Sequence, residues 1–123
     1  MGRYVVFAID DEEAWEAATQ ETKQVTYDHD ERFVKLLEER GGRIAGGAEL
    51  SHSRRTRVLR KGPDGAALVT DGPYAEVVEQ VTGFYIADCD DLASLTEAAE
   101  LMLQGHSRLE IRPSPDEWPR HTR

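Results

Sequence analysis

Apolar and polar residues alternate along the chain in a pattern that predicts two helical regions separated by short strands. Residues 3–9 (RYVVFAI) are β-branched and aromatic, as in a buried strand. Helical character follows over residues 14–40, with an expected break within 19–26, and two glycines then end it. Asp10 and Asp11 are candidate caps for the start of this region.

Apolar stripes predict the core-facing sides of both helical regions. In the first region the stripe follows the i, i+4, i+7 and i+8 spacing and consists of His29, Phe33, Leu36 and Leu37. In the second region, expected between the aspartates at 88–91 and Gly105, the stripe consists of Leu92, Leu95, Ala99 and Met102. Each helix therefore needs an apolar surface to pack against.

Short β-prone segments between and after the helices predict an antiparallel sheet. They are residues 43–45, 56–60, 66–70, 83–87 and 108–112, and the turn-rich KGPDGAA joins the second and third in a hairpin. Two helices packed on one face of such a sheet make an α+β fold, a ferredoxin-like two-layer sandwich. A second copy of the chain is the simplest cover for the other face, so we expect a homodimer. One domain is expected over residues 1–113, followed by a C-terminal tail over 114–123, whose Trp118 is a candidate for docking on a neighbour.

Composition narrows the classes of function. The 123 residues include 24 Asp or Glu and 15 Lys or Arg, for a net charge of −9. Nucleic-acid-binding proteins usually present a basic face, so no nucleic-acid partner is expected. No stretch is apolar for long enough to cross a membrane, and the N-terminal residues lack the pattern of a signal peptide. Since the single cysteine, Cys89, cannot form an internal disulfide, we expect a cytoplasmic protein.

The segment DGPYAE at 71–76, followed by Glu79-Gln80 and by Gly-Phe-Tyr at 83–85, resembles the signature of the DGPF family, a branch of the YCII-related proteins. That signature reads Asp-Gly-Pro-Phe-Ala-Glu-Thr-Lys-Glu before Gly-Phe-Tyr or Gly-Phe-Trp. Here Tyr74 replaces the phenylalanine, and Val77-Val78 replace Thr-Lys. The segment SRLEIRP at 107–113 is similar to the family's final strand.

This resemblance implies a bacterial protein with a dimeric ferredoxin-like α/β-barrel fold, without implying one shared reaction. Some YCII-type relatives carry a histidine–aspartate pair suited to proton transfer, and one relative eliminates chloride from its substrate. DGPF members are often encoded beside extracytoplasmic-function sigma factors, which implies a regulatory link. The family's histidine, placed by its distance from the glycine that ends the first helix, falls on Asp30 or Glu31, with His29 one or two residues earlier.

The Asp-Gly-Pro corner supplies three candidate site residues. Asp71 either caps its own turn by accepting backbone N–H bonds or lines a pocket as a catalytic carboxylate. Tyr74 either fills the core or forms one wall of a ligand pocket. Glu76, three positions before Glu79, is either a solvated surface acid or one of a carboxylate pair in which one pKa rises enough for general-base chemistry.

Two histidines are further candidates. His29, flanked by Asp28 and Asp30 on an apolar stripe, is either an acid–base residue or a half-buried structural histidine. His52 lies in a loop close to Arg57, and these two either bind a small anionic ligand or are simply solvated. His106 and His121 have no supporting context in the sequence.

Two functions of different kinds remain open. No metal and no cofactor are expected, because ligand spacing and a phosphate-binding glycine loop are both lacking. The first function is binding of a small ligand in a pocket near the sheet, with a regulatory link to sigma factors. The second is a lyase- or isomerase-like enzyme in which His29 or Asp71 moves a proton, Tyr74 orients the substrate and Arg57 receives a carboxylate.

Overall fold

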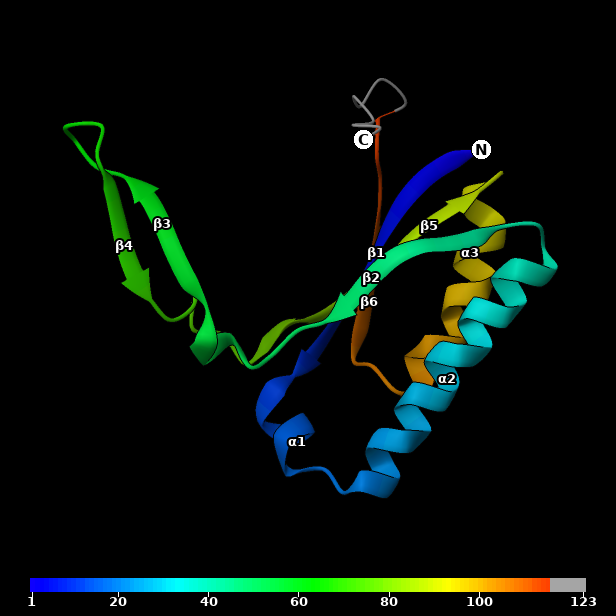
Figure 1. Cartoon of the computed structure of the whole chain (residues 1–123). Coiled ribbons are helices and arrows are strands. Elements are labelled where there is room, and N and C mark those ends of the chain that lie inside the picture. The colour runs from blue at the N-terminus through cyan, green and yellow to red at the C-terminus, as the bar shows by residue number, and fades with distance from the viewer. Residues whose placement is uncertain (116–123) are drawn as a thin grey trace.

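The computed structural model describes residues 1–115, and its body is an antiparallel sheet with two helices on one face (Figure 1). The sheet has the order β2-β5-β1-β6, formed by β1 (Gly2–Asp11), β2 (Arg43–Glu49), β5 (Glu79–Cys89) and β6 (Arg108–Pro113). The helices are α2 (Gln20–Glu39) and α3 (Leu92–Ala99), and a 3-10 turn, η2 (Glu100–Gln104), continues α3. Because this is the β-α-β-β-α-β arrangement of a ferredoxin-like sandwich, the predicted fold is confirmed.

The helix ends explain the predicted break in the first helical region. A short helix, α1 (Glu12–Ala17), begins where Asp11 accepts the Ala14 N–H at 3.1 Å. It stops at Ala18, and α2 begins anew after Thr19, whose hydroxyl oxygen accepts the Thr22 N–H at 3.1 Å. Asp11 rather than Asp10 is therefore the cap of α1, which leaves the Asp10 carboxylate free for other contacts.

The core lies between the sheet and the two helices. Its largest fully buried side chains come from both layers: Val6, Phe33, Leu37, Leu95 and Met102. The predicted stripe on α2 is confirmed, with Leu36 only half-buried. On α3 and η2 the predicted Leu95, Ala99 and Met102 are buried, and Ala98 joins them, whereas Leu92, in the first turn, is 48% exposed.

The predicted hairpin forms, but as a sheet of its own. In the described part of the chain, strands β3 (Arg57–Lys61) and β4 (Ala67–Asp71) pair only with each other, and they project away from the body (Figure 1). A short 3-10 turn, η1 (Ser53–Arg55), lies at the base of this arm, by which we mean residues 57–71. Every residue of β4 is exposed. The DGPYAE segment begins at the last residue of the arm and leads toward the start of β5.

A bulge in β2 shapes the space beside the sheet. The register between β2 and β5 shifts between Ile44 and Gly46, and the next residue, Gly47, has a φ of 152°. A Cβ atom at Gly47 would overlap the carbonyl oxygen of Phe84 on the neighbouring strand. Glycine is thus required for the close approach of these two strands.

No helix within residues 1–115 is long and apolar enough to span a membrane. We predict that Trp118 docks on a neighbour, and this residue lies outside the described residues.

Candidate functional site

A histidine held between two aspartates is the main concentration of buried charge beside the sheet. His106 Nδ1 lies 2.8 Å from Asp10 Oδ2, and its Nε2 lies 2.9 Å from Asp30 Oδ1. The side chains of these three residues, the Asp10–His106–Asp30 triad, are at most 16% exposed. Since each ring nitrogen faces a carboxylate, each carries a proton, and the ring is an imidazolium.

Three separate elements bring the triad together. Asp10 lies near the end of β1, Asp30 is on α2, and His106 lies two residues before β6. The antiparallel pairing of β1 with β6 places Ile9 opposite Arg108, so Asp10, just beyond Ile9, meets the two residues that precede Arg108, Ser107 and His106. Helix α2, which packs on the sheet, places the Asp30 carboxylate against the other ring nitrogen of His106.

Asp10 is the more fully hydrogen-bonded of the two carboxylates. Besides His106, it accepts the Thr82 hydroxyl at Oδ2 and the Ser107 N–H at Oδ1, 2.9 Å away. Burial alone would raise its pKa, but the hydrogen bonds from His106, Thr82 and Ser107 outweigh burial and lower the pKa below its ordinary value. Asp10 is therefore a fixed anion that orients the imidazole.

The charge of His106 follows from the same contacts. Burial by itself would lower its pKa, because it disfavours the charged ring. The hydrogen bonds to Asp10 and Asp30, together with their negative charges, outweigh burial and raise the pKa to about 9. His106 is thus a cation at neutral pH, and it stands between two anions.

Asp30 retains capacity to accept further hydrogen bonds. Its Oδ1 bonds to His106, and its Oδ2 accepts the Tyr85 hydroxyl at 3.1 Å. A carboxylate offers about four acceptor positions, and these two are the bonds that Asp30 makes within the described residues. Burial and the adjacent charge of Asp30 raise the pKa of Tyr85 far above its usual range, so its phenol remains a neutral donor.

The triad lines a cavity of about 300 Å³ between the sheet, α2 and α1. Its walls are largely apolar or aromatic, and they include Ala8, Trp15, Tyr27, Gly47 and Phe84. A mostly apolar hollow of this size with a few convergent polar groups is the usual form of a small-molecule site. The arrangement can hold a small organic molecule against a charged triad and exchange a proton with it.

The structure places His29 outside this cavity. It lies one residue before Asp30 on α2, but its side chain is 9% exposed and faces the core. Its Nδ1 atom is buried and has no hydrogen-bond partner in the described part of the chain. His29 is not among the residues that line the cavity, so its catalytic role stays a prediction without a neighbouring carboxylate to support it.

The structure does not bring Asp71 to His29. Asp71 ends β4 and is exposed, and its Oδ1 lies 3.3 Å from Nε of Arg57, the residue opposite it on β3. Tyr74 is 83% exposed and neither fills the core nor lines the triad cavity. Asp71 and Arg57 thus meet as a solvated ion pair on the arm, at a distance from the triad.

His52 and Glu76 do come near each other, at a second and shallower hollow. Both line a space beside η1 that Pro73 and Val78 also border. His52 is held there by Glu13, whose carboxylate lies 2.7 Å from its Nε2. Ligand binding at this hollow stays a prediction.

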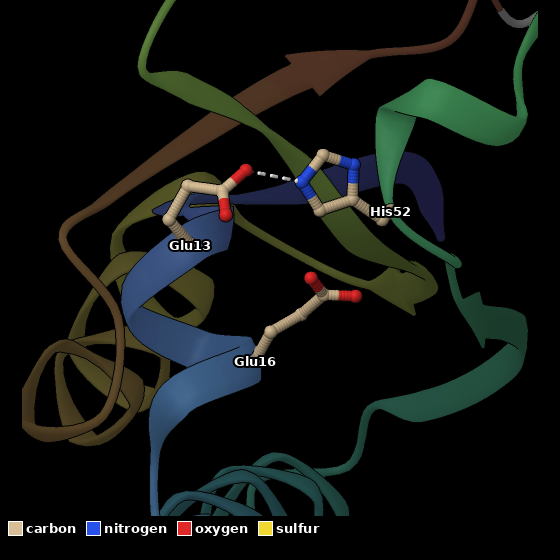
Figure 2. Close-up of side chains that lie close together, drawn as sticks. All are labelled: Glu13, Glu16 and His52. Atoms are coloured by element: carbon tan, nitrogen blue, oxygen red, sulfur yellow. Dashed lines mark hydrogen bonds and ion pairs between the residues drawn. The ribbon is translucent and has the colours of Figure 1, made fainter.

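Glu13, Glu16 and His52 also form a group with the composition of a metal site (Figure 2). Within residues 1–115 their candidate ligand atoms lie within 4.8 Å of one another. However, His52 Nδ1 accepts the Arg54 N–H at 3.0 Å, so its Nε2 carries the proton and donates it to Glu13. The Arg54 guanidinium bonds to both carboxylate oxygens of Glu16, at 2.9 and 2.8 Å. The candidate ligand atoms are therefore already engaged in hydrogen bonds, and the group fastens η1 to α1.

Sequence reasoning missed the central residue of the site. His106 stands alone in the sequence, and Asp10 was interpreted only as a helix cap. The available signal was topological: in a ferredoxin-like sheet the last strand lies beside the first, so a residue that ends strand one meets a residue that begins the last. Asp30, by contrast, is one of the two positions at which the family resemblance placed a functional histidine.

Comparison with known proteins agrees with the fold and the motif. Residues 2–103 match the family model of the YCII-related domain. An uncharacterized protein of Rhizobium meliloti (strain 1021) is 35% identical to this chain over 98 residues, which cover 79% of this chain and 74% of that protein. Asp10 and Asp30 fall within the matched range, and His106 lies just beyond it. The chain belongs to the YCII-related domain family.

Proposed function

We propose that the protein binds a small organic molecule in the triad cavity and exchanges a proton with it through Asp30. The observation that supports this most strongly is a charged histidine with a carboxylate on each ring nitrogen, inside a cavity with apolar walls. Replacing a buried ion cluster of this kind by well-packed apolar residues usually costs no stability, so stability alone does not explain its presence. Strongly perturbed titratable groups that gather in a cleft are typical of functional sites.

The two carboxylates have different roles in this proposal. Asp10 already accepts hydrogen bonds from three donors and holds His106 in place. Asp30 has acceptor positions left and lines the cavity, so it receives the proton from the ligand. His106 then stabilises the charge on Asp30 before the transfer, and the Tyr85 hydroxyl donates to the same carboxylate.

The reaction class that fits this arrangement is a lyase or isomerase. A C–H bond next to an electron-withdrawing group breaks, the proton moves to Asp30, and the electron pair stays on the ligand. Return of the proton to another atom gives an isomer. When the electron pair instead forms a double bond and a leaving group departs with the electrons of its own bond, the result is an elimination product. Neither route requires an oxidant or reductant.

Deuterium exchange tests the proposal without knowledge of the natural substrate. Phenylacetone, a single-ring ketone with acidic C–H bonds, is incubated with the protein in D₂O, and loss of its α-proton signal is followed by NMR. We expect the wild type to accelerate the exchange and Asp30→Asn to fall to the rate in buffer. Glu38→Gln, which removes an exposed carboxylate on the same helix, is the matched control and should behave as the wild type. Equal rates with wild type and Asp30→Asn would contradict the proposal.

We also propose that the chain forms a homodimer in which a second copy covers the arm. Exposed apolar side chains lie on the arm (Leu59, Leu68 and Val69) and on the segment that follows it (Val77 and Val78). An isolated two-stranded sheet is marginally stable in water, so the arm needs a packing partner. Several large exposed apolar side chains close together in the chain favour an interface with another protein.

Membership of the DGPF branch and the regulatory link to sigma factors remain proposals that rest on the motif at 71–85. The acidic surface, with a net charge of −9, supports a protein partner over a nucleic acid. Recovery of a sigma factor with the untagged protein from its native host would support the link, and its absence from such a pull-down would count against it.

A further inference from the structure

We propose that the ligand of the triad cavity is a small organic cation, a protonated amine attached to a single ring, rather than an anion. This inference rests on the proposed function, because it concerns the ligand of the same site. It follows from the charges and the aromatic side chains that surround the cavity.

The cavity is negatively charged. Three carboxylates line it, from Asp10, Asp30 and Glu49, against the single imidazolium of His106. None of the lining residues within the described part of the chain is a lysine or an arginine. A carboxylate or phosphate ligand would therefore enter a site with a net charge of the same sign, and a cation would enter one of opposite sign.

Two tyrosines that line the cavity, Tyr27 and Tyr85, have pKa values that the nearby carboxylates help to raise. For Tyr27, burial is the largest cause of a raised pKa, followed by the hydrogen bond to Glu49 and by the charges of Glu49 and Asp30. For Tyr85, burial comes first and the charges of Asp30 and Glu49 follow. The Tyr27 hydroxyl donates to Glu49 at 3.0 Å and the Tyr85 hydroxyl donates to Asp30 at 3.1 Å, and all four residues line the cavity, so Asp30 and Glu49 act on one shared space.

Acceptors and aromatic rings both suit an ammonium group. Asp30 has unused acceptor positions, and an ammonium is a donor with no acceptor. Trp15 lines the cavity, and its ring meets Tyr27 edge to face with centroids 5.7 Å apart. Aromatic faces attract cations. The Trp15 ring already has one cation beside it, the Lys23 ammonium, which lies 5.4 Å from the ring centroid. Lys23 itself is not among the residues that line the cavity.

The volume limits the rest of the molecule. About 300 Å³ is at the lower end for ligand pockets, which favours a single ring over a fused or extended molecule. The apolar wall formed by Ala8, Ala48 and Phe84 provides the surface on which such a ring can pack.

Three probes of the same size separate charge from shape: benzylamine, benzyl alcohol and benzoate at pH 7. Each is titrated into the full ¹⁵N-labelled chain, and the amides of Gly47 and Gly83 report binding because both glycines line the cavity. The amide of Ala67 on the arm reports non-specific effects. We expect benzylamine to bind about tenfold more tightly than benzoate, with benzyl alcohol between them.

Two variants assign the preference to the cavity. Glu49→Gln should weaken benzylamine roughly three- to tenfold and leave benzyl alcohol unchanged, because one carboxylate is lost while the shape is kept. Glu38→Gln removes the same charge from the exposed side of α2 and should change neither affinity. Benzoate binding as tightly as benzylamine, or no effect of Glu49→Gln, would overturn the cation assignment while leaving a ligand site in place. Unchanged Gly47 and Gly83 amides with all three probes would overturn both the cation assignment and the proposed function.

Discussion

His106 Nε2 lies 2.9 Å from Asp30 Oδ1, a contact between the loop that leads into the last strand and the middle of the long helix, 76 positions apart in the sequence. Asp10 holds the opposite ring nitrogen at 2.8 Å, so one imidazole joins the first strand, the helix and the last strand. This contact therefore links the stability of the fold to the protonation of the candidate site.

His106 should make the stability of the protein depend on pH above neutrality. Its pKa is raised to about 9 in the folded chain from an ordinary value of 6.5, so its contribution is complete below pH 6.5 and disappears as the pH rises through 9. The free energy of unfolding should fall by about 2 to 3 kcal/mol between pH 7 and pH 10 through this group. Urea unfolding at the two pH values measures this fall.

The control is His106→Gln, measured over the same range. Its stability is expected to be lower at pH 7, but the fall between pH 7 and pH 10 should be smaller by the amount assigned to His106. An identical fall in both proteins would show that other groups cause it.

Asp10→Asn should destabilise the fold more than Asp30→Asn. Asp10 accepts three donors, and an amide in its place would meet the Ser107 N–H, the Thr82 hydroxyl or His106 with its own NH₂ group. Loss of such a buried charged network costs about 2–4 kcal/mol. Within residues 1–115 Asp30 accepts only from His106 and Tyr85, so its substitution should cost less and act mainly on the ligand. Parallel urea titrations compare the two, and a larger loss for Asp30→Asn would reverse the assignment of roles.

Much of the fold could be predicted from the sequence because local patterns specify it. The stripe containing Phe33 and Leu37, and the strand at 3–9, need only their neighbours in sequence to be recognised. The triad could not be found in the same way, because His106 and Asp10 have no local pattern and meet only through the pairing of β1 with β6. The motif at 71–76 drew attention to Asp71 and Tyr74, yet a sequence signature does not tell whether a turn faces a cavity or solvent.

Gly47→Ala should be strongly destabilising and should close part of the cavity. At its φ of 152° a side chain is strained, and the added Cβ would overlap the Phe84 carbonyl oxygen. We expect a loss of about 2–4 kcal/mol by thermal or urea unfolding. Gly46→Ala is the control, because its Cβ would meet only Ile86 Cδ1 at an ordinary 3.6 Å. Equal losses at the two positions would contradict the close approach described for Gly47.

The arm should be the site of dimerisation. Light scattering at micromolar concentration should give twice the chain mass of 13.8 kDa for the wild type. Leu59 and Val69 lie directly opposite each other on the arm and are 64% and 54% exposed. Replacing both with lysine should yield a monomer, whereas Glu38→Lys on the exposed side of α2 should remain dimeric. A wild-type particle of 13.8 kDa would disprove the dimer.

The central claim is that His106 is a cation fixed between Asp10 and Asp30, and ¹⁵N NMR titration of its imidazole tests this most directly. We predict that both ring nitrogens carry protons at pH 7 and that the ring titrates with a midpoint near pH 9. In Asp30→Asn the midpoint should move down, because one of the two carboxylates is lost. A midpoint at or below 6.5 in the wild type, or a single protonated ring nitrogen at pH 7, would contradict the claim.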